Sequence, residues 1–192
     1  MTTPDPDSPA GFVSYVKERI TEPGARSDLR SGLGKPVELS PRMHRVIAWK
    51  VHARAGSAME RAHYGVAALI ASRTRQARDR EPATESGGRS LGQALAAAVN
   101  HSGLRDNTAE GRLHLLVRQN LDGVHRQLIA VIRLLDARGQ EPDWVSLLWD
   151  LARWESDRDR IAQRWLQDYY RTLRRASDTT SPSPSPDTSN ES

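Results

Sequence analysis

The side chains of this chain that are best suited to chemistry are its arginines. All but three of the 28 basic residues are Arg, the exceptions being Lys17, Lys35 and Lys50. Arginine presents a planar fork of N–H groups that holds a phosphate at two points and stacks on bases, whereas lysine is a point charge. This bias favours a nucleic-acid partner. A G+C-rich genome that encodes Arg in place of Lys explains it equally well on composition alone.

The positive charge is concentrated between residues 8 and 177. The whole chain carries 28 basic and 24 acidic residues, a formal net charge of +4. Five acidic residues and no basic ones lie outside this segment, so the segment itself has a net charge of +9. The outlying acids are Asp5, Asp7, Asp178, Asp187 and Glu191. A positive excess favours anionic partners and says nothing about the fold.

Four arginines near the end of the chain could act together on a row of phosphates. They are Arg160, Arg164, Arg171 and Arg175. In a helix, about 100° per residue places all four within an arc of about 60°. The apolar stripe on the other side comprises Ile161, Trp165, Leu166, Tyr169 and Leu173. The arginines are therefore expected to point away from Trp165 and Tyr169 and to form a cationic face that binds nucleic acid. Asp157 and Asp168 lie near its edge and could neutralise part of it.

Motifs for catalysis or metal binding are lacking in the sequence. There is no Walker loop, GxSxG or HExxH pattern. The absence of Cys leaves no disulfide, thiolate nucleophile or thiolate metal site. His44 and His52 could share a helix face, but a pair lacks the third ligand that a metal site needs. The alternating charges from Asp157 to Arg160 are typical of a capped, solvated helix start. We therefore expect a protein that is not an enzyme and holds no cofactor or metal.

The element that must position the cationic face is the tryptophan-rich stretch from Asp143 to Tyr170. It contains four of the five tryptophans. From Trp144 to Trp154 it is apolar on almost every side, which is typical of a helix inside a bundle. Its length, without internal Gly or Pro, favours helix over strand. Pro142 and Asp143 supply a start signal, because Asp caps the first free backbone N–H groups.

The rest of the chain also has helical periodicity. Helix starts are predicted at Ser8-Pro9, Ser40-Pro41, Ser90 and, as a weaker capping box, Asn107-x-x-Glu110. Glu22-Pro23-Gly24 is expected to end the first helix, and residues 25–39 to form a short turn around Leu29 and a loop. Further helices are expected at Ala58–Arg75 and at 121–138, the latter ended by Gly139. The basic run from Arg73 to Arg80 is explained by its place at a helix C-terminus.

These patterns predict an all-α fold, a two-subdomain helical bundle with disordered termini. The expected divisions are a disordered segment 1–8, an N-terminal helical subdomain 9–75, a polar connector 76–89, a C-terminal helical bundle 90–177 and a disordered Ser/Pro-rich tail 178–192. The sequence has no apolar run long enough to span a membrane and no secretory signal. Because the chain has no Cys, a reducing, cytoplasmic location is expected.

Several short patterns resemble the CasB family, the small subunit of the type I-E CRISPR surveillance complex Cascade. They are Ser90-Leu91-Gly92-x-Ala94-Leu95, Arg112-Leu113-x-x-Leu116 with Arg118, Asp143-Trp144 with Leu147, Leu151 and Trp154, and Asp168-Tyr169. The Leu29-Arg30 turn and the Pro-containing loop after it are also similar. The resemblance covers about residues 12–173 and rests on the order and spacing of these patterns. The tail and residues 81–85 lie outside it.

The resemblance implies an all-α, non-enzymatic subunit. Its implied partners are other Cascade protein subunits, a second copy of itself stacked head to tail, guide RNA, and target and non-target DNA. Its implied role is to stabilise the R-loop, including the displaced non-target strand. Guide pairing reads the sequence in such complexes, so this subunit needs only charge and shape. The resemblance adds Arg30, Arg112 and Arg118 to the candidate nucleic-acid or inter-subunit contacts.

Two other function classes stay open on the residues alone. One is a free-standing helical DNA-binding regulator, which would need a recognition helix after a tight turn; no clear helix-turn-helix pattern is present. The other is a protein-interaction adaptor whose arginines pair with acidic partners. For each arginine named, a solvated surface ion pair explains the residue as well as a functional contact does.

Overall fold

The computed structural model describes residues 5, 8–51, 56–79 and 88–180. In these ranges the regular structure is entirely helical, which confirms the all-α fold class. The α-helices are α1 (Pro9–Arg19), α2 (Pro23–Arg30), α3 (Pro41–Ile47), α4 (Ser57–Ser72), α5 (Arg75–Arg78), α6 (Leu91–Ser102), α7 (Asp106–Val117), α8 (Leu121–Ala137), α9 (Trp144–Ala152) and α10 (Trp154–Thr180). Two 3₁₀ helices, η1 (Val37–Leu39) and η2 (Ala48–Lys50), flank α3. None of the described helices is long and apolar enough to cross a membrane.

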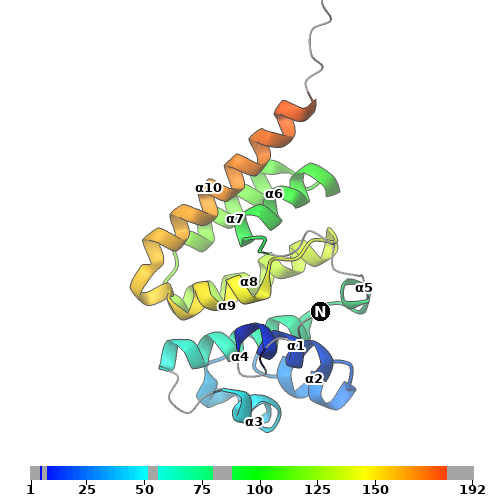
Figure 1. Cartoon of the computed structure of the whole chain (residues 1–192), viewed down its shortest axis with the longest axis vertical. Coiled ribbons are helices and arrows are strands. Elements are labelled where there is room, and N and C mark those ends of the chain that lie inside the picture. Colours follow the sequence, from blue (N-terminus) through cyan, green and yellow to red (C-terminus); the bar gives the residue numbers. More distant parts are fainter. Residues whose placement is uncertain (1–4, 6–7, 52–55, 80–87, 181–192) are drawn as a thin grey trace, which may run out of the picture.

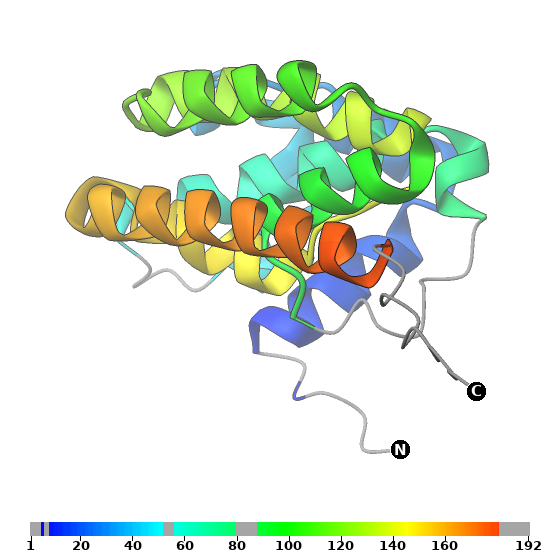
Figure 2. The same ribbon diagram turned by 90° about the horizontal axis from the view of Figure 1, so that it is seen from above.

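The helices lie in stacked layers. In Figure 1, α10 runs diagonally across the upper part with α6 and α7, whereas α8 and α9 form the middle and α1 to α4 lie below them. The most extensive packing between helices joins α10 to α6, followed by α4 to α9. Figure 2 shows α10 from above, extended along one side of the molecule. α10 is therefore held in place on its inner side, mainly by α6 and also by α7 and α9.

One continuous core runs through these layers. Trp154, Trp165 and Tyr169 are its largest fully buried side chains, and the same cluster reaches Phe12 and Leu29 in the first two helices. The tryptophan-rich stretch is thus the core, as predicted. It consists of two helices, because the chain turns at Arg153, and α10 bends again at Asp157, whose φ of −126° and ψ of 21° are not helical. α9 is also less enclosed than predicted, since Trp149 is 36% exposed.

Several predicted helix ends are confirmed. Ser8, Ser90 and Asp143 each accept backbone N–H groups at the start of α1, α6 and α9, and Ser90 forms a full capping box with Gln93. Gly139 has a φ of 69°, the left-handed conformation expected after α8. The structured start at Ser8 and the extension of α10 to Thr180 shift the expected boundaries of the ends slightly. Residues 181–192 lie outside the described residues.

One predicted helix start is wrong, and two other predictions hold only in part. α3 begins at Pro41 after Ser40, as predicted, but the hydroxyl of Ser40 donates to the carbonyl of Pro36 instead of capping the helix. α7 begins at Asp106, and its N-cap is Arg105 rather than Asn107. Pro23 does not only end the first helix but also opens α2, since proline is compatible with the first helical turn.

Arg73, the first residue of the basic run after α4, has a different role from the predicted one, whereas Arg80 lies outside the described residues. Arg73 is buried, and its guanidinium donates to Asp136 at 2.9 Å, to Glu141 and to the carbonyl of Ala77 at 3.1 Å. Asp136 also accepts from the backbone N–H of Thr74 at 3.3 Å. Arg73 therefore joins the end of α4 to α8 and to the segment before α9, which a helix dipole alone does not explain. The division into two subdomains at 76–89 stays a prediction.

Gly92 sets the closeness of α6 and α10. A Cβ atom at this position would overlap the carbonyl oxygen of Trp165 and lie 3.1 Å from the backbone N of Tyr169. The two helix backbones therefore touch, because glycine permits an approach that no other residue does. This contact fixes which side of α10 is buried and which side carries the arginines.

Candidate nucleic-acid interface

The cationic face of α10 lies on its solvent side. Arg160, Arg164, Arg171 and Arg175 are all exposed, and the bend at Asp157 precedes all of them. The regular helix after the bend therefore keeps their predicted phase, within an arc of about 60° at about 100° per residue. Arg174 is also exposed and lies about 40° from Arg160 by the same count, so it extends this face beyond the four predicted residues.

Arg164 differs from its neighbours on the cationic face because it is tied to the core. The carboxylate of Asp150 in α9 accepts a hydrogen bond from Nη2 of Arg164 and another, 2.7 Å long, from Nε1 of Trp165. Asp150 is only 6% exposed, and these two hydrogen bonds offset the cost of burying its charge. The prediction that Arg164 stands apart from Trp165 is wrong: the two side chains share one acid. The expected neutralising residues, Asp157 and Asp168, were on α10 itself, whereas Asp150 comes from the preceding helix.

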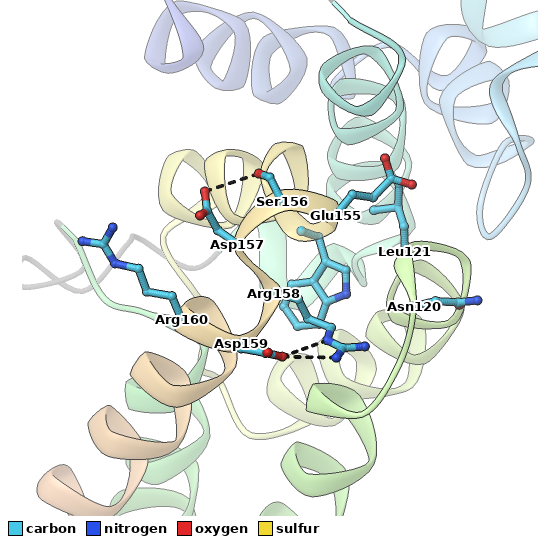
Figure 3. Close-up of a pocket in the computed structure, with 9 residues that line it drawn as sticks. Asn120, Leu121, Glu155, Ser156, Asp157, Arg158, Asp159 and Arg160 are labelled. Carbon is cyan, nitrogen blue, oxygen red and sulfur yellow. Dashed lines mark hydrogen bonds and ion pairs between the residues drawn. The ribbon is translucent and has the colours of Figure 1, made fainter.

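Arg160 lies at the rim of a hollow beside the bend in α10. The hollow has a volume of about 660 Å³ and is lined by Asn120, Leu121, Trp154 and residues 155–160. Figure 3 shows Arg160 pointing outward, away from the pair formed by Arg158 and Asp159. That pair is close, with Nη2 of Arg158 at 3.1 Å from Oδ1 of Asp159. The hollow therefore carries charges of both signs, and Arg160 belongs to the outer surface of α10.

Arg171 borders a shallow groove along the same helix. The groove, of about 500 Å³, is formed by Asp159, Ala162, Gln163, Leu166, Gln167, Tyr170 and Arg171. Tyr170 closes it toward α7, since its hydroxyl donates to Glu110 at 2.6 Å and lies 3.0 Å from Nε2 of His114. The bond to Glu110 raises the pKa of Tyr170 to about 12. The tyrosine therefore stays neutral at physiological pH and adds no negative charge beside Arg171.

The buried neighbour, Tyr169, anchors α10 from its inner side. Burial and the hydrogen bond that its hydroxyl donates to Asp106 both raise the pKa of Tyr169. Together, Tyr169 and Tyr170 fasten α10 to α7 through two carboxylates. These contacts hold the helix at a fixed rotation, which keeps the arginines directed to solvent.

The three arginines predicted from the family resemblance lie elsewhere. Arg112 and Arg118 are exposed residues of α7 and its C-terminal cap. Arg112 is two residues from Glu110, about 200° around the helix, so it faces away from the edge that contacts α10. Arg30 is exposed on α2, in the lower part of Figure 1. The seven predicted arginines therefore fall on three surfaces, with four on α10, two on α7 and one on α2.

The groups that could suggest chemistry are engaged in structural contacts. His44 lies 2.6 Å from the hydroxyl of Tyr64, whereas His52 lies outside the described residues. Burial lowers the pKa of His125 to about 4, and its ring packs against Gly65 between α8 and α4. Among the residues that the structure describes, no three His, Asp or Glu side chains are grouped so that they could hold a metal ion.

Comparison with known proteins identifies the fold. No curated protein matches the chain. Two solved structures, described as "CRISPR RNA-guided surveillance complex" and the same complex "pre-nicking", contain a chain that is 42% identical to this one and superposes with TM-scores of 0.80 and 0.81. In both, the match covers 90% of this chain and 97% of that chain.

More distant structures share the architecture. The Cse2-family protein of Thermus thermophilus is 26% identical, with a TM-score of 0.64 over 84% of this chain and 97% of its own. CasB of M. ruber, at 23% identity, shares the fold with a TM-score of 0.73 over 90% of this chain and 98% of its own. The family model "CRISPR-associated protein Cse2" matches residues 25–170, and these matches confirm the resemblance to CasB. The chain belongs to the CRISPR-associated protein Cse2 family.

Proposed function

We propose that this chain is a non-catalytic subunit of a Cascade-type CRISPR RNA-guided surveillance complex and binds the nucleic-acid backbone. The observation that carries this proposal is the 42% identity, over 90% of the chain, to a chain in structures of such a complex. The other subunits of the complex, guide RNA, and target and non-target DNA are its proposed partners. A second copy of the chain is a further proposed partner.

The cationic face of α10 is the proposed contact with a single strand of the R-loop. Exposed arginines in one arc can follow successive phosphates, and such contacts position a protein without reading bases. Arg160 and Arg171 are better placed for this role than Arg164, because Arg164 already pairs with Asp150. The charge on the face is thus only partly neutralised. In the proposed complex the guide RNA reads the sequence, so a backbone contact is sufficient for this subunit.

The test is a salt titration with the assembled complex. Arg160→Ala combined with Arg171→Ala removes two phosphate contacts without removing the partner of Asp150. For single-stranded contacts, the slope of log K against log salt should become less steep by about 1.4, at about 0.7 per phosphate. Arg126→Ala combined with Arg133→Ala is the matched control, because it removes two exposed charges from α8 and should leave the slope unchanged.

The outcomes separate the possible surfaces. A loss of affinity that depends on the target sequence would contradict a backbone contact. Unchanged slopes in a folded double variant would move the strand to another surface, for which Arg30, Arg112 and Arg118 are the remaining candidates. Purification of the tagged protein from its host tests the two alternative classes. Recovery without guide RNA or other complex subunits would favour a free-standing regulator or an adaptor.

A further inference from the structure

A second concentration of positive charge lies in the N-terminal half of the molecule. One side of α2 and the start of α3 form a hollow of about 410 Å³, lined by Pro23, Arg26, Ser27, Arg30, Ser31 and Arg42. Three of these six residues are arginines and two are serines, so the lining consists mainly of hydrogen-bond donors. α2 lies at the opposite end of the molecule from the C-terminal half of α10 (Figure 1). This hollow is therefore separate from the cationic face.

The fold holds the arginines of the hollow in place. Nε and Nη2 of Arg26 each donate, over 3.2 Å, to the carbonyls of Ala71 and Arg73 at the end of α4. Nε of Arg42 donates over 3.0 Å to Asp28, a residue that is only 9% exposed. The backbone of α4 thus holds the side chain of Arg26, and the buried acid Asp28 holds that of Arg42. Their positions are set before any ligand arrives.

The charge around the hollow is positive. Burial lowers the pKa of Arg26, and so does repulsion from Arg78 and Arg30. Burial is the larger cause, and the positive charges of these two neighbours add to it. Asp28 is shared, because Arg45 also approaches it at 4.0 Å. An anion in the hollow would relieve this repulsion.

We infer that this hollow is a phosphate-binding site for the nucleic-acid backbone, formed by Arg26, Arg30 and Arg42 with the hydroxyl of Ser27, whereas the hydroxyl of Ser31 donates to the carbonyl of Asp28 over 2.6 Å. The guanidinium of Arg30, the remaining N–H groups of Arg26 and Arg42, and a serine hydroxyl match the oxygens of a phosphate group. A mobile surface arginine loses side-chain entropy when it binds, whereas Arg26 and Arg42 are already fixed. The inference rests on the proposed function and adds to it: the subunit would hold a strand at two separate places, on α10 and on α2.

The phosphate could belong to a phosphodiester within a strand or to a strand end. The direct test follows the arginine Nε–H signals of the full chain by ¹H–¹⁵N NMR during titration with three probes. These are inorganic phosphate, a ten-nucleotide thymidine strand with a 5′-hydroxyl, and the same strand with a 5′-phosphate. Shifts of Arg26, Arg30 and Arg42 with both strands identify a phosphodiester site. Shifts with only the phosphorylated strand identify a site for a strand end, and both results support the inference.

Arg30→Gln is the test variant, since Arg30 is exposed and its side chain can be shortened without opening the core. It should weaken phosphate binding about tenfold, which corresponds to one charge-assisted hydrogen bond. The control is Arg133→Gln, which makes the same change at an exposed position of α8 and should leave binding unchanged. Equal weakening of phosphate binding in both variants would mean that phosphate is attracted by the net charge of the protein rather than bound at this site. That result would overturn the inference.

Two further outcomes would overturn it. One is a set of Nε–H signals that no probe moves, and the other is a shift with inorganic phosphate that neither strand reproduces, which would mark an adventitious ion only. The result is distinguishable from a failure of the proposed function. If the salt slope of the assembled complex still depends on Arg160 and Arg171, only the α2 site fails. If the complex does not form while the α2 signals respond to both strands, only the proposed assembly fails.

Discussion

The indole N–H of Trp165 and the carboxylate of Asp150 form a buried hydrogen bond 2.7 Å long. It links α9 to α10 inside the core, and the same carboxylate holds Arg164 at the surface. A single acid on a mostly apolar helix thus satisfies a core donor and restrains one residue of the cationic face. The binding surface and the core are therefore coupled at this position.

Asp150→Ala should destabilise the fold by about 2–3 kcal/mol, because it leaves the buried indole N–H of Trp165 without an acceptor. Asp150→Asn retains an oxygen acceptor and removes only the charge that pairs with the half-exposed Arg164. It should therefore cost less than about 1 kcal/mol. Urea unfolding of both variants and the wild type measures the difference. Equal losses would show that the ion pair, rather than the indole, determines the effect.

Gly92 and Gly111 provide a matched pair of helical glycines. Gly92→Ala places a methyl group against the backbone of α10 and should cost about 1–3 kcal/mol by overpacking, after any gain in helix propensity. At Gly111 a Cβ atom meets nothing within 4 Å, so Gly111→Ala should stabilise α7 by up to about 1 kcal/mol. Thermal unfolding compares the two. A stable Gly92→Ala variant would mean that α6 and α10 can separate at little cost.

His125 should make the fold sensitive to acid. Burial lowers the pKa of His125 from 6.5 to about 4, so the unfolded chain takes up a proton at a higher pH than the folded one. The contribution of neutral His125 to the free energy of unfolding is fully present above pH 6.5 and is lost as the pH falls toward 4. Between pH 7 and pH 4.5 the loss should be roughly 2.5 kcal/mol. Unfolding of the wild type and of His125→Gln at both pH values isolates this loss from that of the carboxylates. Identical pH dependence would contradict a neutral buried histidine.

Arg73 and Arg75 differ in burial although they are two residues apart. The side chain of Arg73 is 9% exposed and pairs with Asp136 and Glu141, whereas that of Arg75 is 88% exposed. Arg73→Ala should cost about 3–5 kcal/mol, because two acids with little exposure lose their partner. Arg75→Ala should stay within about 0.5 kcal/mol of the wild type. Denaturant unfolding checks both values, and a small effect at Arg73 would mean that water replaces the guanidinium.

Helical periodicity predicted most of the fold. The apolar spacing of 121–138 and the capping residues Ser8, Ser90 and Asp143 depend on contacts within a few residues, which a sequence displays directly. The pairing of Arg73 with Asp136 joins positions 63 residues apart, and nothing local distinguishes Arg73 from Arg75. Local patterns therefore identified the helices and missed the buried ion pairs between them.

The candidate sites show the same limit. The spacing of Arg160 and Arg171 in the sequence predicted correctly that both lie on the same side of one helix. The tie between Arg164 and Asp150 was not, because it depends on how two helices meet, although a lone acid in an apolar helix was a usable signal. The hollow at Arg26, Arg30 and Arg42 brings together two helices, and Arg42 gave no sign of belonging with the α2 arginines. Residues that act across helices need the fold before they can be grouped.

The close contact of α6 with α10 also affects how the protein is made. Asn100 of α6 donates to the carbonyl of Thr172, 72 residues later in the chain, and Gly92 meets the backbone of Trp165. A ribosome that adds about 5–20 residues per second needs roughly 4–14 s to synthesise the intervening chain. During that interval the side of α6 that packs against α10 has no permanent cover, because α10 is the last of the described helices to emerge. The helix that carries the cationic face is thus also the element that covers this side of α6 after the other described helices have been synthesised.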